Sequence, residues 1–102
     1  MLPASIGSGD IHGRHLYTIR LPKEFNYSRD MFIKKLKDIS IGVGVHYNAI
    51  PTYSIYQKLF GWNVEDYPHA YEYGRQTISL PLSSGMTIED ARYVVEGIKY
   101  LI

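Results

Sequence analysis

Four histidines are the side chains of this sequence best suited to chemistry near neutral pH. His12 and His15 are separated by two residues, while His46 and His69 lie elsewhere in the chain. Histidines alone can bind a metal, but no pair has the HExxH spacing of helical zinc sites or a carboxylate at a usual ligand spacing. We therefore expect no metal site.

The serines and acidic residues form no pattern typical of nucleophilic or acid–base catalysis. Ser79, Ser83 and Ser84 lack the GxSxG turn of an esterase nucleophile. Acidic residues are adjacent only at Glu65–Asp66, in an expected loop, and at Glu89–Asp90, at the start of an expected helix. We assign no catalytic residue, and an independent hydrolase is disfavoured.

The elements that must position these side chains are strands alternating with helices. Apolar residues alternate over 15–21, 42–47 and 77–82, which predicts three strands. In the second strand, Val43, Val45 and Tyr47 would share one face and His46 would lie on the other.

Helical spacing of apolar residues predicts the helices between these strands. Ser28 is the expected N-cap of the first helix, and Thr87 with Asp90 approximates a capping box for the last. Two short helices are expected at 52–60, capped by Thr52 and stopped by Gly61, and at 67–75. The order predicts an α/β (α+β) fold, a small three-stranded sheet with helices packed on it.

Length and composition place the chain among small globular domains. Its 102 residues fit one domain, which we assign to residues 15–102 after a linker or flexible end over 1–14. A formal charge of +1 gives no electrostatic footprint for nucleic acid, and no apolar run is long enough to cross a membrane. The absence of cysteine is compatible with the cytoplasm, where we expect the protein.

Tyrosine is unusually frequent, with 10 residues among the 102. Chance enrichment explains this as well as a functional cause does. The other explanation is that one face packs against another protein surface, because tyrosine is apolar along its body and polar at its tip.

Five segments form an ordered pattern along the chain. They are His15-Leu16-Tyr17-Thr18-Ile19-Arg20-Leu21, Ser28-Arg29-Asp30-Met31-Phe32-Ile33-Lys34-Lys35-Leu36, Ile41-Gly42-Val43-Gly44-Val45-His46-Tyr47, Thr77-Ile78-Ser79-Leu80-Pro81-Leu82 and Met86-Thr87-Ile88-Glu89-Asp90. None of the segments is specific alone, but in this order they resemble one family over about residues 12–101, the DegT/DnrJ/EryC1/StrS sugar aminotransferases of fold type I.

The resemblance implies that this chain is the small C-terminal domain of a longer, homodimeric enzyme that uses pyridoxal 5'-phosphate. In that family the large N-terminal domain carries the Schiff-base lysine and most cofactor contacts, and none of those motifs occurs here. The family reaction transfers an amino group, usually from glutamate, to a keto sugar nucleotide. We therefore expect no cofactor-binding residue in this chain and no activity from it alone.

The resemblance also suggests substrate-side residues. The family pattern places a histidine and an aromatic residue beside the active-site cleft, matching His46 and Tyr47, and a loop with Asn48 and Tyr53 follows. A purely structural His46, bonded to backbone, is the alternative, and Tyr47 on the apolar face favours a core position. His15 matches a family His–Leu–aromatic pattern and is expected to be mainly structural.

Two positions depart from the family pattern. Arg14 stands where an aromatic residue is usual, and Gln76 stands where a basic residue is common. These differences put packing or substrate contacts in doubt, not the family. A stand-alone, non-catalytic binding or dimerisation module descended from the family is the alternative function. The sugar and the carbon that is aminated stay open.

Overall fold

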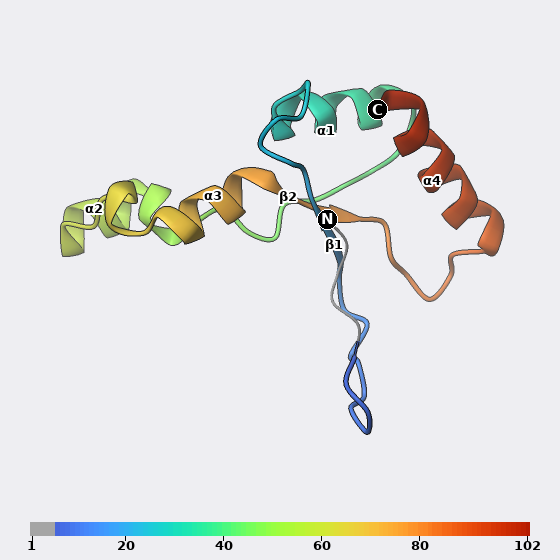
Figure 1. The fold of residues 1–102 in the computed structure, drawn as a ribbon, viewed down its shortest axis with the longest axis horizontal. Coiled ribbons are helices and arrows are strands. Elements are labelled where there is room, and N and C mark those ends of the chain that lie inside the picture. Colours follow the sequence, from blue (N-terminus) through green and yellow to red (C-terminus); the bar gives the residue numbers. More distant parts are fainter. Residues whose placement is uncertain (1–5) are drawn as a thin grey trace.

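The computed structural model describes residues 6–102 and has a mixed α/β fold, as predicted (Figure 1). Residues 6–16 form neither helix nor strand, and the first five residues of the expected linker over 1–14 lie outside the described part. The elements in chain order are β1 (Tyr17–Arg20), α1 (Arg29–Asp38), η1 (Ile50–Thr52), α2 (Ser54–Phe60), η2 (Val64–Asp66), α3 (Pro68–Gln76), β2 (Thr77–Leu80) and α4 (Ile88–Leu101).

The sheet consists of β1 and β2, which pair antiparallel with Tyr17 opposite Leu80 and Arg20 opposite Thr77. Both strands are shorter than the predicted 15–21 and 77–82. Pro22 and Pro81 explain where the pairing stops, because proline has no N–H to donate to a ladder. Next to Pro22, the last backbone hydrogen bond between the two segments runs from the Leu21 N–H to the Gln76 carbonyl at 3.1 Å.

The predicted third strand over 42–47 is wrong, so the sheet has two strands rather than three among residues 6–102. Only Gly44 pairs with β2, through two backbone hydrogen bonds to Ser79 at 3.0 and 2.8 Å. Gly42 and Gly44 offer no side chains for cross-strand packing, and the chain bends at His46. A glycine-rich segment of this kind holds one bridge and no ladder.

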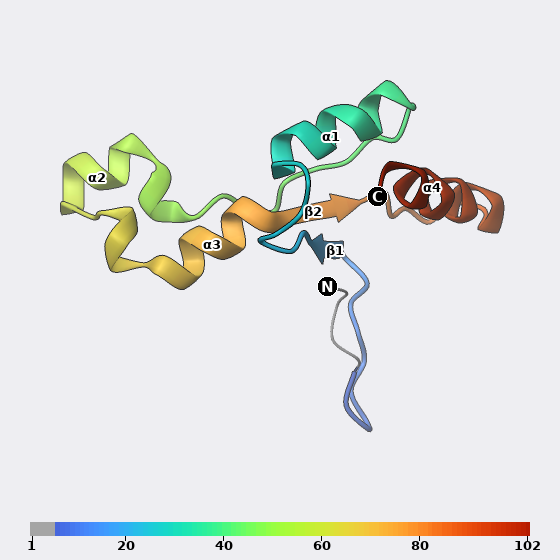
Figure 2. The ribbon, with the colours of Figure 1, turned by 45° about the horizontal axis from the view of Figure 1, so that its top comes forward.

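Helix α1 packs against β2 and against α4, which lies beyond the end of β2, and these elements contribute to one core (Figure 2). Phe32 and Leu36 from α1 are fully buried together with Ile78 of β2, and Val94 of α4 joins the same cluster. Ile98 and Leu101 of α4 pack against the same cluster, whereas Val95 is 47% exposed.

The ends of α1 and α4 follow the sequence pattern. The Ser28 hydroxyl accepts a hydrogen bond from the Met31 N–H at 3.3 Å. At the start of α4, Thr87 and Asp90 form the reciprocal capping box. These caps satisfy helix N–H groups that have no partner within the helix.

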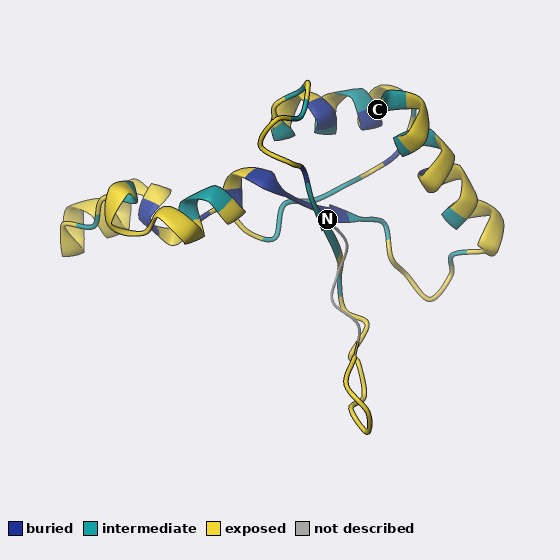
Figure 3. Cartoon of the chain, viewed as in Figure 1, coloured by how far each residue is buried: buried dark blue, intermediate teal, exposed yellow. Residues whose placement is uncertain are grey.

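The segment from η1 to α3 forms an arm that extends away from the sheet (Figure 1). Figure 3 shows the arm as mostly exposed, and no residue of α2 is buried. Gly61 ends α2 with a left-handed φ of 66°, as predicted. The predicted Thr52 cap is wrong: Tyr53 is the N-cap without a side-chain bond, because the Thr52 hydroxyl donates to the Ala49 carbonyl instead.

Aromatic rings pack together in the outer part of the arm. Trp62 lies within 5.9 Å of Tyr56, 5.3 Å of Phe60 and 5.6 Å of Tyr67, measured between ring centroids. Within residues 6–102, no helix combines the length and the apolar character needed to cross a membrane.

Candidate functional site

His46 lies in the segment between α1 and η1 and is held by a polar chain that begins on the sheet. Its Nδ1 atom is 2.9 Å from the Ser79 hydroxyl, which lies 3.4 Å from the Thr18 hydroxyl. Ser79 is only 4% exposed, whereas His46 is half-buried. A hydrogen bond at Nδ1 restricts the imidazole ring and leaves Nε2 as the nitrogen available to a ligand.

The Ser79 hydroxyl and the His46 ring form a pair that the sequence did not indicate. The sequence pattern tests Ser79 only as a nucleophile and offers His46 a bond to backbone as the alternative. The observed partner is a side chain. A weak signal was present in β2, where Thr77 and Ser79 are polar and alternate with Ile78 and Leu80.

Tyr47 does not belong to the core, and that expectation is wrong. Its side chain is 68% exposed, because the segment bends at His46 and does not continue as a strand. The Tyr47 ring packs edge-on against the His46 ring with a centroid distance of 5.0 Å. An exposed phenol beside a half-buried imidazole is an arrangement open to a polar ligand.

Asn48 is fixed by an arginine from α1. Its Oδ1 atom accepts a hydrogen bond from Arg29 Nη1 at 3.2 Å, and the same nitrogen donates to the Gly74 carbonyl at 2.8 Å. Tyr53 lies further along, at the junction of η1 and α2, and is 44% exposed. His46, Tyr47 and Asn48 thus form one group, and Tyr53 belongs to the arm.

Helix α3 packs against the backbone of this group at Gly74, a position where only glycine fits. A Cβ atom on Gly74 would lie 2.6 Å from the Ala49 nitrogen and 3.3 Å from the Tyr47 carbonyl oxygen. The backbone of residues 47–49 therefore rests directly on α3. Three contacts position the group of residues 46–48. Ser79 bonds to His46, Arg29 bonds to Asn48, and the backbone packs on Gly74.

His15 and His46 line one shallow cavity of about 380 Å³, together with Gly44 and Ser79. His15 is exposed, and its mainly structural role stays an expectation. The cavity brings together two imidazoles from segments far apart in the sequence. No group of three metal-binding side chains occurs in the described residues.

The lysines do not fit a Schiff base with pyridoxal phosphate. Such a lysine must be shielded from water and placed against the cofactor. None of the lysines among the described residues is buried. Lys23, which lines two cavities, is 66% exposed and pairs with Glu72 at 3.6 Å.

A short sheet with helices on it and a polar segment at its edge define a small α/β domain with an exposed arm. Residues 2–99 match the DegT/DnrJ/EryC1/StrS aminotransferase family. Since the match spans nearly the whole sequence, the chain belongs to this family, and the sequence resemblance is confirmed.

Curated relatives and solved structures agree with this assignment. The chain is 34% identical to the spore coat polysaccharide biosynthesis protein SpsC of Bacillus subtilis and 33% identical to the uncharacterized protein MJ1066 of Methanocaldococcus jannaschii. Each alignment covers 89% of this chain and 24% of the relative. The chain therefore spans about a quarter of the length of the curated relatives it matches.

Solved structures that match this chain include three of Spr1654 of Streptococcus pneumoniae, a protein designated a sugar aminotransferase. Its apo, PMP and PLP forms each superpose with a TM-score of 0.78 at 32% identity. The superposition covers 86% of this chain and 22% of that protein. A match to a short segment of a longer protein is what a C-terminal domain would give.

Proposed function

We propose that this chain is the C-terminal domain of a pyridoxal phosphate-dependent transaminase that moves an amino group from glutamate to a keto sugar nucleotide. The observation that carries the proposal is the family match over residues 2–99, combined with coverage of only about a quarter of each relative. A domain of this kind contributes shape and substrate contacts, and the chemistry belongs to the rest of the enzyme.

Substrate contact is the role proposed for His46, Tyr47, Asn48 and Tyr53. A sugar presents hydroxyl groups, which imidazole, phenol and amide side chains bind through directional hydrogen bonds. His46 and Asn48 are supported by Ser79 and Arg29, so their polar atoms are already held in position. Such preorganisation lowers the entropy cost of binding.

Pyridoxal phosphate supplies the electron sink of a transamination when it is bound. The described residues offer no shielded lysine for it, so we assign the cofactor to the large domain and assign no cofactor contact to this chain. Consistently, we expect the isolated chain to be inactive.

The missing large domain is the partner proposed for the exposed apolar surface. The arm exposes large apolar side chains, and the fold leaves a groove of about 420 Å³ between the end of β2 and α4. Exposed apolar patches of this kind mark contact surfaces. The arm residues concerned are Ile50, Tyr53, Ile55, Leu59 and Phe60.

A chimera tests the proposal directly. Residues 15–102 would replace the aligned segment of a characterised sugar aminotransferase of this family, and amination of its keto sugar nucleotide would be measured. We expect activity to be retained and His46→Ala to reduce kcat/KM. The matched control is His69→Ala, which replaces an exposed histidine on α3 and should leave kcat/KM unchanged. A folded, cofactor-loaded chimera without activity would contradict the proposal.

The cofactor assignment has a separate test. Pyridoxal phosphate is added to the 102-residue chain, the mixture is reduced with borohydride, and intact masses are measured. We expect no stoichiometric adduct on one lysine. A single fully labelled lysine would show that the chain holds its own cofactor.

The alternative is a stand-alone, non-catalytic binding or dimerisation module descended from the family. The exposed apolar side chains of the arm favour this alternative, because a second copy of the chain would cover them in a dimer. A chimera that is inactive, together with a 102-residue chain that sediments as a tight dimer, would support this alternative.

A further inference from the structure

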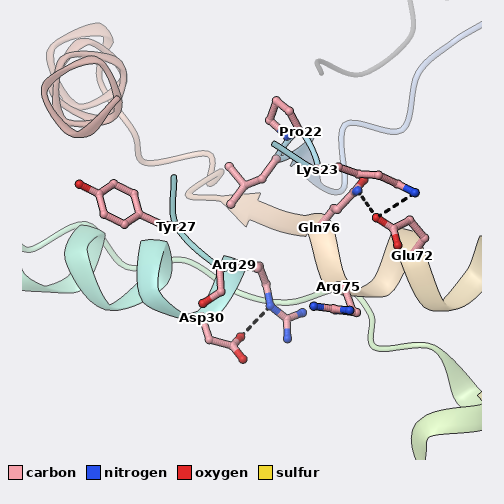
Figure 4. A pocket seen from close by; sticks show the side chains of 10 residues that line it. Pro22, Lys23, Tyr27, Arg29, Asp30, Glu72, Arg75 and Gln76 are labelled. Carbon is pink, nitrogen blue, oxygen red and sulfur yellow. Dashed lines mark hydrogen bonds and ion pairs between the residues drawn. The ribbon is translucent and has the colours of Figure 1, made fainter. Parts of the chain in front are cut away.

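A second cavity, separate from the one lined by His46, lies between the start of α1, the turn after β1 and the last turns of α3 (Figure 4). Its volume is about 330 Å³. Three cationic residues line it, Lys23, Arg29 and Arg75, against two acidic residues, Asp30 and Glu72.

Arg29 is anchored so that part of its guanidinium group stays available. Its side chain is only 13% exposed, with Nε bonded to Asp30 at 2.7 Å and Nη1 bonded to the Gly74 carbonyl at 2.8 Å. Within the described part of the chain, its Nη2 atom makes no hydrogen bond. The guanidinium plane is thereby fixed before any ligand arrives.

Arg75, on α3, lines the same cavity as Arg29. Figure 4 shows its guanidinium group pointing toward that of Arg29, and both residues line the cavity. The face of Arg75 lies over the Tyr71 ring at 5.5 Å, and no ion pair joins Arg75 to a carboxylate among residues 6–102. Stacking on an aromatic face leaves the edge donors of a guanidinium free.

The two carboxylates of the cavity are already engaged. Asp30 accepts from Arg29, while Glu72 accepts from Gln76 Nε2 at 2.6 Å and pairs with Lys23. Two guanidinium groups that face each other repel, and an oxyanion between them replaces that repulsion with charge-assisted hydrogen bonds.

We propose that this cavity binds a small oxyanion, a phosphate or a carboxylate group, between the guanidinium groups of Arg29 and Arg75. The forked donors of arginine match the oxygens of both groups. The proposal is independent of the transaminase assignment, because it uses none of the four sugar-contact residues. Arg29 also bonds to Asn48, so a bound anion would be felt in the neighbouring segment.

Nuclear magnetic resonance titration of the ¹⁵N-labelled 102-residue chain tests this site. Sodium phosphate and sodium acetate are added to separate samples at constant ionic strength, and the amide signals of Gly74 and Arg75 are followed. We expect saturable shifts with at least one anion. Phosphate alone indicates a phosphate-ester ligand, and acetate indicates a carboxylate ligand.

Two variants localise the binding. Arg75→Gln should weaken the affinity roughly tenfold, since it removes charge-assisted hydrogen bonds. Arg92→Gln, on α4 with a side chain that is 74% exposed, is the control and should leave the affinity unchanged. Arg75→Lys keeps the positive charge but lacks the paired guanidinium donors, and it replaces Arg75→Gln in the test if that variant does not fold. Absence of saturation with both anions, or unchanged affinity in the folded Arg75 variant, overturns the proposal.

Discussion

Replacing Gly74 by alanine should destabilise the domain, although alanine favours helices. Gly74 is buried in α3, where its missing side chain lets the backbone of residues 47–49 pack directly on the helix. A Cβ atom there would lie 2.6 Å from the Ala49 nitrogen and 3.3 Å from the Asn48 carbonyl carbon. These contacts are with backbone, which cannot rotate away as the end of a side chain can.

Two opposing terms set the magnitude. Alanine in place of glycine within a helix gains about 1 kcal/mol of intrinsic helix stability. Forcing an additional methyl group into a packed contact costs about 1–3 kcal/mol, and a backbone contact belongs to the upper part of that range. We therefore expect Gly74→Ala to lower the free energy of unfolding by about 1–2 kcal/mol.

Urea denaturation followed by far-UV circular dichroism measures this difference. Gly42→Ala is a matched control, because a Cβ atom on Gly42 meets nothing within 4 Å. It should stay within about 0.5 kcal/mol of the unchanged chain. The amide signals of His46 and Asn48 should also move in Gly74→Ala and not in the control. A Gly74→Ala chain as stable as the unchanged chain, with these signals in place, would refute the close packing of α3 on residues 47–49.

Three further substitutions test the sheet and the last helix. Thr77→Val should raise the free energy of unfolding by about 1 kcal/mol in urea titrations, because the Thr77 hydroxyl is buried without a hydrogen-bond partner; a loss would mean that the hydroxyl has one. Ser79→Ala should lower it by about 1 kcal/mol and release the His46 ring, seen as a changed tautomer balance in ¹⁵N spectra; an unchanged ring spectrum would contradict the positioning role. The pKa of Asp90 lies below its usual value because its carboxylate accepts hydrogen bonds, first from the Thr87 backbone N–H and then from the Thr87 hydroxyl. That stabilisation is present above the unfolded pKa of roughly 4 and is lost as pH falls through the lower folded pKa. Asp90→Asn should therefore make the free energy of unfolding less dependent on pH on the acid side. An equal pH dependence in both chains would argue against this role of Asp90.

Local signals predicted most of the elements that frame the candidate site. Ser28, Gly61 and the Thr87–Asp90 capping box act through neighbours within a few residues, so their effect is visible in the sequence. The two strands were also predicted, though too long, because prolines at their ends outweighed the alternation of apolar residues.

The site was predicted only in part for the opposite reason. His46, Tyr47, Asn48 and Tyr53 came from the family resemblance, and their role in binding stays a prediction. Their supports depend on contacts between segments far apart in the chain. Ser79 lies 33 residues from His46, and Arg29 lies 19 residues from Asn48.

The sequence by itself determined the family, the α/β class and the helix ends, because each depends on local patterns or on ordered motifs along the chain. Tertiary structure alone decided that residues 42–47 form one bridge instead of a strand, that Tyr47 faces outward, and that Arg29 and Arg75 share a cavity. These features depend on which surfaces meet once the chain folds, and side-chain identity along the sequence does not encode that directly.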